Sequence, residues 1–387
     1  MLQYSQDATA PPAPTALPLI PLVNLSPAID RVRDEVLRGF KEVLDTSAFV
    51  GGPRVAEFEA AFARFCSQQY CVGVGNGTDA LEVALRAVGV EAGDEVIVPA
   101  NSFAASAEAV SRIGATPVFV DVLDSGLIDA ERISDAVSTR TTAIIPVHLY
   151  GHMADMPAVN QVAQRFGLAV IEDAAQAHGA RQRGVPVGAT SAMAAYSFYP
   201  GKNLGAFGDG GAVTTDDPAL ARRARMIAQH GAERRYEHEV AGFNSRLDAL
   251  QAVVLLARLR DLHLDNALRR HVADRYADLL WDFPLATPAA AEGDEPVWHL
   301  YVVHLADGLR RDDVLAELRD RGVEAGIHYP VPLHLTGAFR SSRLGPGDLP
   351  RAEFRASSIL SLPMFPQLRI RDQERVVEAL VASGVRP

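Results

Sequence analysis

The sequence lacks the features that would place the chain in a membrane or on nucleic acid. No apolar run approaches the roughly 18 residues that a helix needs to cross a bilayer. The formal net charge is −11, so no basic surface dominates the field that would attract nucleic acid or an anionic membrane. There are only two cysteines, Cys66 and Cys71, and their spacing matches neither a redox pair nor a metal site. We therefore expect reduced, buried thiols and no metal.

The N-terminal segment also lacks what a secretory signal requires. Its first twenty residues contain no lysine or arginine, and hence no basic region ahead of an apolar one. We expect a cytoplasmic protein. Five prolines, the first at Pro11 and the last at Pro21, remove backbone donors. We therefore expect residues 1–21 to form an extended arm.

The composition of the chain is that of a globular protein with two domains. Of 387 residues, 48% are hydrophobic and 22% are charged, which is close to ordinary globular usage. A single core stops growing at roughly 250 to 300 residues. We therefore expect a large domain over residues 22–260 and a smaller C-terminal domain over residues 261–387.

Short apolar runs predict a parallel α/β sheet in the large domain. Each is followed by a polar or glycine-containing turn and usually by an amphipathic helical stretch, such as 78–88, 104–113 or 156–166. That alternation is typical of a parallel sheet covered by helices. The seven expected strands are Cys71–Val74, Val96–Val98, Val118–Val120, Ile144–Val147, Ala169–Ile171, Ala194–Phe198 and Ala212–Thr214. After about residue 216 the pattern changes to a long helix at 247–264 and a strand at 297–305, which indicates an α+β domain.

Ligands of parallel sheets bind at the carboxyl ends of the strands, and three expected strands end in chemically distinctive residues. The turn that contains Gly77 and Thr78 opens a helix, whose free N–H groups suit a phosphate, although such turns are as often purely structural. Asp173 closes a buried strand, where it either faces a ligand or caps the next helix. Lys202 follows a third strand among glycines and apolar residues, an environment that lowers the pKa of an amine toward the value that Schiff-base chemistry requires.

A phosphate cradle, a carboxylate and a lysine on successive strand ends are the parts that pyridoxal phosphate needs. The cradle anchors the phosphate, the acid keeps the ring nitrogen protonated, and the amine holds the aldehyde. Four segments carry a further resemblance: Gly77–Leu81, Glu172–Gln176, Ser197–Asn203 and Phe243–Leu247. In them, and over nearly the whole chain, the sequence resembles the DegT/DnrJ/EryC1/StrS sugar aminotransferases. The resemblance implies an aspartate-aminotransferase-like fold, PLP fold type I.

The resemblance also implies roles at the cofactor. Lys202 would bind the aldehyde, Asp173 would pair with the ring nitrogen, and Gln176 would lie against the cofactor. It places Gly77, Thr78 and Asp79 at the cofactor, with Thr78 and Ser197 on its phosphate. Phe103 would stack on the ring, unless it simply belongs to the core.

Further residues are implied at the substrate and between subunits. Tyr199, His328 and Tyr329 resemble positions that line a sugar pocket, although a His-Tyr pair before proline is also compatible with a packed turn. Asn244 would reach the phosphate of the neighbouring subunit's cofactor, which implies a homodimer with shared active sites. His148 and His178 are interpreted as structural histidines.

The function that this resemblance implies is transfer of an amino group from glutamate to a nucleotide-linked ketosugar. The finest detail, at Tyr199 and around His328, resembles the branch that acts on dTDP-3-keto-6-deoxyhexoses. A 4-keto-sugar aminotransferase and a non-catalytic partner with a PLP fold remain alternatives. Lys202 argues against a sugar dehydratase, in which histidine replaces the lysine, and the glycine spacing does not match a nicotinamide-binding turn.

Overall fold

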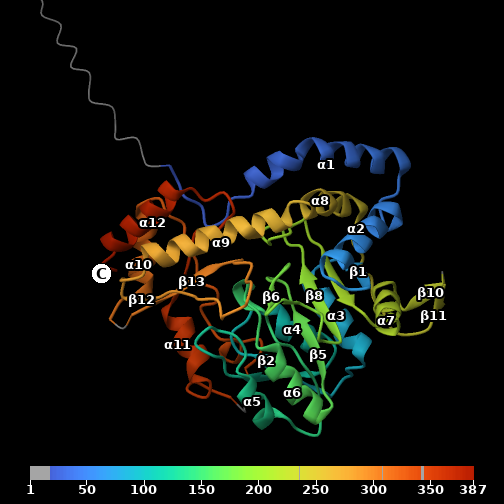
Figure 1. Ribbon diagram of the computed structural model, residues 1–387. Coiled ribbons are helices and arrows are strands. Elements are labelled where there is room, and N and C mark those ends of the chain that lie inside the picture. The colour runs from blue at the N-terminus through green and yellow to red at the C-terminus, as the bar shows by residue number, and fades with distance from the viewer. Residues whose placement is uncertain (1–17, 235, 307, 341–343) are drawn as a thin grey trace, which may run out of the picture.

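The computed structural model describes residues 18–234, 236–306, 308–340 and 344–387. A seven-stranded sheet forms its centre (Figure 1). The strands of this sheet are β1 (Tyr70–Val74), β2 (Glu95–Pro99), β3 (Thr116–Val120), β4 (Thr141–Ile144), β5 (Ala169–Asp173), β8 (Met193–Ser197) and β9 (Gly211–Thr215).

The sheet is mainly parallel, as the sequence predicted. Its strands follow the spatial order β1, β9, β8, β5, β4, β2 and β3. β9 runs antiparallel to both of its neighbours, and the other neighbouring pairs are parallel. The predicted bounds of the fourth strand were wrong, because β4 ends at Ile144 and the run 144–147 continues beyond it. Pro146 has no N–H for a ladder hydrogen bond, so the chain leaves the regular strand there.

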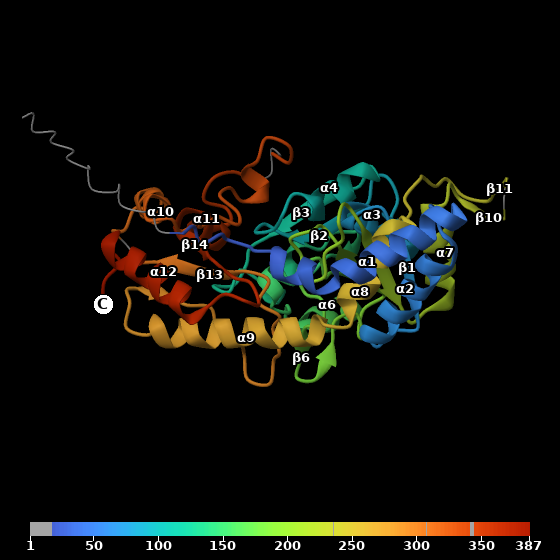
Figure 2. The same ribbon diagram turned by 90° about the horizontal axis from the view of Figure 1, so that it is seen from above.

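Helices cover both faces of this sheet (Figures 1 and 2). They are α2 (Gly52–Phe65), α3 (Gly77–Val88), α4 (Ala105–Arg112), α5 (Ala130–Ala136), α6 (Met156–Phe166), α7 (Pro218–Ala228) and α8 (Ala249–Leu259). A further helix, α1 (Ser26–Thr46), packs on the outside of α8. The predicted cap of α6 is present, because the side chain of Asp155 accepts a hydrogen bond from the Ala158 backbone N–H at 3.2 Å.

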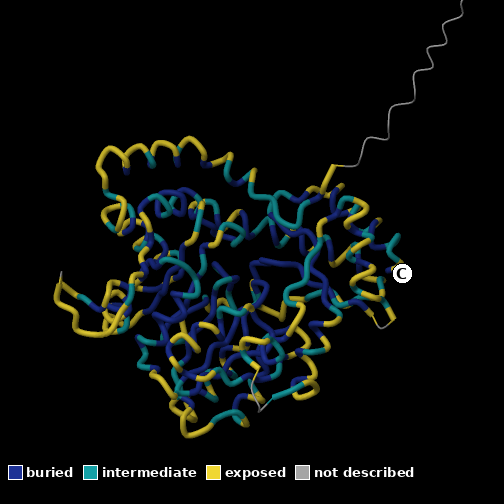
Figure 3. Tube along the Cα trace, turned by 180° about the vertical axis from the view of Figure 1, so that it is seen from behind, coloured by how far each residue is buried: buried dark blue, intermediate teal, exposed yellow. Residues whose placement is uncertain are grey.

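Side chains that alternate along each strand separate two apolar cores. Val96 and Val98 of β2 belong to the cluster that packs against α3, α4 and α7. Ile97, between them, belongs to the opposite cluster, which contains residues of α2, α6 and α8. This alternation is the two-residue period of a strand. The interior is almost wholly buried, whereas the outer face of α1 is exposed (Figure 3).

The C-terminal part contains a three-stranded antiparallel sheet with its own apolar cluster. Its elements are α9 (Leu262–Leu279), β12 (Leu285–Ala286), β13 (Tyr301–Leu305), α10 (Arg311–Asp320), α11 (Pro350–Ser358), β14 (Ile359–Leu362) and α12 (Ile370–Ala382). Figure 1 shows α9 continuing from α8 into this part. We propose that the boundary between the two domains lies after residue 260.

Two predicted elements of this region had the wrong bounds. The single helix expected over 247–264 is divided into α8 and α9 at Arg260 and Asp261, because a tighter turn there interrupts an apolar pattern that itself continues. The strand expected over 297–305 begins only at Tyr301. Trp298 has a φ of 47°, which is incompatible with an extended strand.

The remaining elements are short, and the two 3-10 turns among them are mainly buried. They are the hairpins β6 (Arg181–Gln182) with β7 (Val185–Pro186) and β10 (Ala232–Arg234) with β11 (Glu237–His238), and the 3-10 turns η1 (Leu149–Gly151) and η2 (Leu333–Leu335). Most of the arm predicted at residues 1–21 lies outside the described residues. Ile20 is described, and its N–H donates to the carbonyl of Gly322 at 2.8 Å. None of the helices in the described ranges has both the length and the apolar character that crossing a bilayer needs.

Candidate active site

A cavity of about 610 Å³ lies at the carboxyl ends of β5 and β8, beside the first turn of α3. This is the edge at which parallel α/β sheets bind ligands. The predicted site residues that line it are Gly77, Thr78, Phe103, Asp173, Gln176, Ser197, Tyr199, Lys202, His328 and Tyr329. Asp79 and Asn244, which were also predicted, do not line it.

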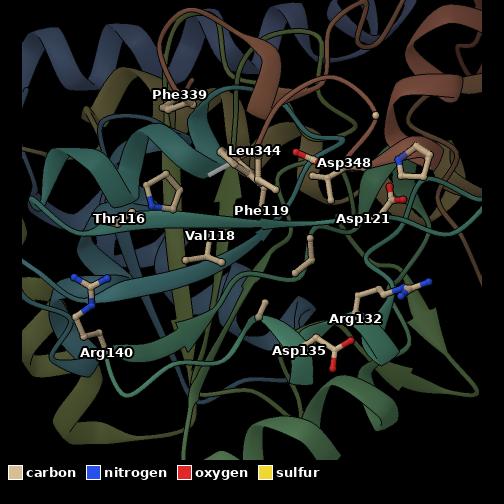
Figure 4. A pocket seen from close by; sticks show the side chains of 16 residues that line it. Thr116, Val118, Phe119, Asp121, Arg132, Asp135, Arg140, Phe339, Leu344 and Asp348 are labelled. Carbon is tan, nitrogen blue, oxygen red and sulfur yellow. The ribbon is translucent and has the colours of Figure 1, made fainter. Parts of the chain in front are cut away.

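A larger cavity of about 870 Å³ lies along β3, at the edge of the sheet (Figure 4). Two of its charged side chains serve the fold. The carboxylate of Asp121 accepts the backbone N–H of Ala352 at 2.9 Å, and Arg140 forms an ion pair with Glu95. The smaller cavity, in contrast, contains an amine beside a carboxylate. The chemistry of the side chains, and not the size of the cavity, therefore identifies the candidate site.

The turn between β1 and α3 forms the side of the cavity that suits a phosphate. Asn76 caps the helix by accepting the Asp79 backbone N–H at 2.8 Å. The N–H groups of Gly77 and Thr78 have no acceptor among the described residues. A Cβ at residue 77 would lie 2.6 Å from the Cβ of Ser197, so glycine is needed for this close approach to β8. The free N–H groups lie at the positive end of α3, together with the hydroxyls of Thr78 and Ser197. Such a group of donors fits an anion.

The carboxylate of Asp173 is buried and is held in one orientation. One oxygen, Oδ2, accepts the hydroxyl of Ser106 at 2.7 Å, and Oδ1 accepts the backbone N–H of Ala175 at 3.2 Å. The hydroxyls of Ser102 and Ser106 are 2.7 Å apart. Because Ser106 donates to Asp173, it accepts from Ser102. Two hydroxyls in series therefore stabilise the ionised carboxylate.

Lys202 lies in a tight turn after β8. Its backbone N–H donates to the carbonyl of Tyr199 at 2.8 Å. A Cβ at residue 205 would lie 2.3 Å from the carbonyl oxygen of Pro200, so the turn requires Gly205. Burial lowers the pKa of the Lys202 amine to about 8, while the negative charge of Asp173 acts in the opposite direction. Part of the amine is therefore neutral at neutral pH, and the neutral amine is the form that attacks a carbonyl.

A network of buried side chains holds both ends of this turn. His178 Nε2–H donates to the carbonyl of Ser197 at 2.9 Å. Asn266 on α9 donates to the carbonyl of His178 at 2.8 Å, and its own Oδ1 accepts from Asn203 Nδ2 at 3.0 Å. Ser197 and Asn203, which flank the turn of Lys202, are thus connected through His178 and Asn266. We call this chain of hydrogen bonds the lysine-turn network.

Gln176 is fixed at the floor of the cavity. Its Oε1 accepts the backbone N–H of Tyr150 at 2.7 Å, so its Nε2 is the donor on the other side. That Nε2 donates to the hydroxyl of Tyr329 at 3.3 Å. Gln176 therefore connects the segment after β4 with the His328–Tyr329 segment of the C-terminal part.

Over residues 30–381 the chain matches the DegT/DnrJ/EryC1/StrS aminotransferase family. The chain belongs to this family. It is 46% identical to a dTDP-3-amino-3,4,6-trideoxy-alpha-D-glucose transaminase of Streptomyces venezuelae, across 94% of this chain and 96% of the relative. It is 40% identical to a dTDP-3-amino-3,6-dideoxy-alpha-D-galactopyranose transaminase of Aneurinibacillus thermoaerophilus, across 95% and 100%. A crystal structure of S. venezuelae DesV in complex with a ketimine intermediate has a TM-score of 0.92 at 45% identity, across 96% and 100%.

The protein is therefore a DegT/DnrJ/EryC1/StrS aminotransferase, and its cofactor is that of the family, pyridoxal phosphate. The side chains of the cavity fit this group. Free N–H groups at the start of α3 suit its phosphate, the oriented carboxylate of Asp173 suits its ring nitrogen, and the amine of Lys202 suits its aldehyde.

Two exposed aromatic side chains, Phe103 and Tyr199, line the aminotransferase cavity. Phe103 is 55% exposed, so the alternative that it belongs to the core is wrong. Its ring centroid is 5.7 Å from that of Tyr329. Tyr199 is also exposed, at the mouth of the cavity. Both rings are accessible to a ligand.

His328 lies deeper in the cavity. Its Nδ1 is 2.8 Å from the hydroxyl of Ser361, and burial lowers its pKa to about 4. The segment therefore packs against β14 and also reaches the cavity, so the two readings of the His-Tyr pair are compatible.

Asp79 and Asn244 belong to one assembly outside the cavity. Ser245 donates its hydroxyl to Asp79 at 2.7 Å and accepts the backbone N–H of Gly75 at 2.9 Å. Asp79 also pairs with Arg112 at 3.0 Å. These contacts hold the segment that carries Asn244, which is itself exposed. Asp79 thus holds the segment of Asn244 through Ser245, whereas Gly77 and Thr78 line the cavity.

Several residues of the site were not predicted from the sequence. Ser102 and Ser106 are ordinary in composition, and only the fold brings Ser106 to Asp173. Asn203 lies within a recognised segment, but its partner Asn266 is far away in the sequence. His299 also lines the cavity. No sequence signal distinguishes it from a packed histidine.

Proposed function

We propose that the enzyme transfers the amino group of L-glutamate to carbon 3 of a dTDP-linked 3-keto-6-deoxyhexose. The observation that carries this proposal is the partly buried amine of Lys202 in one cavity with the oriented carboxylate of Asp173. Gly77, Thr78 and Ser197 would hold the cofactor phosphate, and Gln176 and Phe103 would flank the ring.

Bound pyridoxal phosphate supplies an electron sink that stabilises negative charge on the carbon next to the transferred nitrogen. Asp173 keeps a proton on the ring nitrogen by a charge-assisted hydrogen bond. Lys202 Nζ accepts the proton that leaves the α-carbon of glutamate. In the second half of the reaction it delivers a proton to the sugar carbon that receives nitrogen. The hydroxyl of Ser106 and the N–H of Ala175 hold the carboxylate of Asp173 in place throughout.

The names of the relatives support the choice of substrate. Both curated relatives are named for dTDP sugars that carry nitrogen at carbon 3. Their sugars differ at carbon 4, where the 3,4,6-trideoxy compound lacks the hydroxyl that the 3,6-dideoxy compound keeps. Tyr199, His328 and Tyr329 offer hydroxyl and imidazole contacts to a pyranose in the cavity.

The alternative substrate is a 4-keto sugar. A 3-keto carbonyl lies nearer the diphosphate than a 4-keto carbonyl, so the two substrates need different poses over Lys202. Measuring kcat/KM for matched 3-keto and 4-keto dTDP-6-deoxyhexoses, with glutamate as donor, separates them. We expect the 3-keto sugar to react faster. Preference for the 4-keto sugar would refute the regiochemistry and leave the aminotransferase assignment intact.

We also propose a homodimer with shared active sites. Among the described residues that line the cavity, Lys202 is the only lysine or arginine, whereas the phosphate, the diphosphate and the glutamate carboxylates are all anionic. Asn244 and Arg246 are exposed on the segment that Asp79 and Ser245 hold. In a dimer this segment would supply polar and cationic groups to the neighbouring cavity.

A further inference from the structure

His299 is a cavity residue to which neither the sequence nor the proposed mechanism gives a role. It lies just before β13, and its side chain lines the same cavity as Lys202 and His328. Only 8% of the residue is exposed. Its protonation pattern is determined by the lysine-turn network.

Hydrogen bonds to backbone carbonyls determine the orientation of the Asn203 and Asn266 amides. Asn266 Nδ2 lies 2.8 Å from the carbonyl of His178, which only accepts, so this atom is the donor. Asn203 Nδ2 lies 2.8 Å from the carbonyl of Val297 and 3.0 Å from Asn266 Oδ1, so it too is the donor. The remaining atom of the second amide, Asn203 Oδ1, must therefore be an acceptor.

The orientation of the Asn203 amide determines the tautomer of His299. Its Nδ1 lies 3.1 Å from Asn203 Oδ1, and a hydrogen bond there requires the proton on Nδ1. The ring is neutral because burial lowers its pKa well below the usual value, with the charges of Lys202 and Arg269 acting in the same direction. Nε2 therefore carries a lone pair. It has no hydrogen-bond partner among the described residues, and it is not among the side-chain atoms sealed from solvent.

Because Nε2 of His299 is an acceptor without a donor, it favours a ligand that carries a hydrogen-bond donor. Tyrosine hydroxyls donate as well as accept, so Tyr199 and Tyr329 fit many polar groups, whereas this nitrogen fits only a donor. The reacting carbon of the sugar has to reach Lys202, whose charge is felt at His299. The hydroxyls on the adjacent carbons are then the nearest donors.

We propose that Nε2 of His299 accepts a hydrogen bond from a sugar hydroxyl on a carbon adjacent to the aminated carbon. The proposal rests on the proposed function, because it needs a hexose over Lys202. His299 is then a specificity-determining residue. A sugar without that hydroxyl leaves a desolvated nitrogen unpaired, which is how a polar site rejects a deoxy analogue.

The test is a binding measurement on the pyridoxamine-phosphate form of the enzyme. Amino-sugar products bind this form without reacting, since both partners carry the amine. Three probes are titrated by calorimetry: a dTDP-3-amino-3,6-dideoxyhexose, its 4-deoxy analogue and its 2-deoxy analogue, with dTDP alone as the reference. We expect wild type to bind one deoxy analogue roughly 10- to 100-fold more weakly than the parent, the range expected when one buried partner is left unpaired.

The variant His299→Phe should lose this discrimination and keep its affinity for dTDP. His299→Gln, which retains an acceptor, should keep part of the discrimination and covers the case in which the phenylalanine variant does not fold. His271→Phe, at an exposed histidine on α9, is the matched control and should behave as wild type.

Two results would overturn the inference alone. They are equal wild-type affinity for all three probes, and full discrimination retained in both folded His299 variants. A wild-type enzyme that binds neither dTDP nor any of the amino sugars would instead contradict the proposed substrate, and the inference with it.

Discussion

Asp173 and Lys202 line the same cavity and are held by opposite electrostatic effects. A serine hydroxyl and a backbone N–H hold the carboxylate of Asp173 in one orientation. Lys202 is made easier to deprotonate because burial penalises its charge. In the proposed mechanism, Asp173 would keep the ring nitrogen positive and Lys202 would exchange protons.

Replacing the carboxylate tests the first of these roles. Asp173→Asn keeps the shape of the side chain and removes its charge, so the ring nitrogen loses its stabilising partner. We expect proton abstraction to slow by at least ~10²-fold, the scale of losing one strong electrostatic catalyst. Single-turnover kinetics with glutamate measure this step. A near-wild-type rate would mean that Asp173 serves only to hold the turn after β5 through the Ala175 N–H.

The lowered pKa of Lys202 predicts how the apoprotein takes up its cofactor. Only the neutral amine attacks the aldehyde, and with a pKa of about 8 most of it is protonated at neutral pH. The rate of covalent uptake should therefore rise about tenfold per pH unit below 8 and level off above it. Stopped-flow absorbance across pH 6 to 9.5 measures the profile. A midpoint near the ordinary lysine value would contradict the effect of burial.

Residue chemistry was predictable from the sequence where it depended on strand ends, and not where it depended on distant partners. Asp173 and Lys202 were found because each follows an apolar strand of a parallel sheet. Ser106 and His299 were missed, since their roles arise from contacts with residues far along the chain.

At the scale of elements, the lysine-turn network connects α9 to the turn after β8. Asn266 satisfies a carbonyl of His178 and the amide of Asn203, both of which are buried. Its loss should therefore affect both stability and the position of Lys202.

Asn266→Leu tests this connection. It leaves the buried carbonyl of His178 unpaired, at roughly 1–3 kcal/mol in the free energy of unfolding. It also removes one of the two hydrogen bonds that Asn203 Nδ2 donates, while the bond to the Val297 carbonyl remains. Asn160→Leu is the matched control, because Asn160 makes only a surface hydrogen bond to Thr190. Denaturant unfolding and kcat of both variants give the comparison. Equal unfolding curves for the two would contradict a role of the network in stability.

Two predicted element bounds, for the helix at 247–264 and the strand at 297–305, were wrong for a common reason. The break between α8 and α9 lies within a continuous apolar pattern, so periodicity gives no sign of it. Residues 297–300 are buried like those of a strand, but Trp298 takes a left-handed conformation. Hydrophobic periodicity reports burial, and burial does not require regular structure. The central sheet was predicted well because its strands are both buried and regular.

At the scale of the whole molecule, the β10–β11 hairpin projects from the end of the body opposite α10 and α12 (Figures 1 and 2). Asn244 lies in the segment that follows this hairpin and is exposed. The proposed dimer would use this projecting region to complete the neighbouring site.

Mixing two inactive variants tests the shared site. In a heterodimer of Lys202→Ala and Asn244→Ala subunits, one site carries both defects and the other carries none. Random exchange should therefore restore about a quarter of wild-type activity, since half of the dimers are mixed. Activity after co-refolding, with sedimentation to establish the dimer, gives the result. An active monomer, or no recovery from a mixture of dimers, would contradict shared sites.

Covalent binding of pyridoxal phosphate to Lys202 for amino transfer would be visible in the absorbance spectrum of the purified protein. We predict a yellow protein whose visible band disappears when L-glutamate is added and returns with the ketosugar. Lys202→Ala should fold, lack the band of the wild-type resting enzyme and retain no more than a few per cent of the activity. A colourless cofactor-loaded wild type, or a Lys202→Ala variant that turns over at the wild-type rate, would contradict the account.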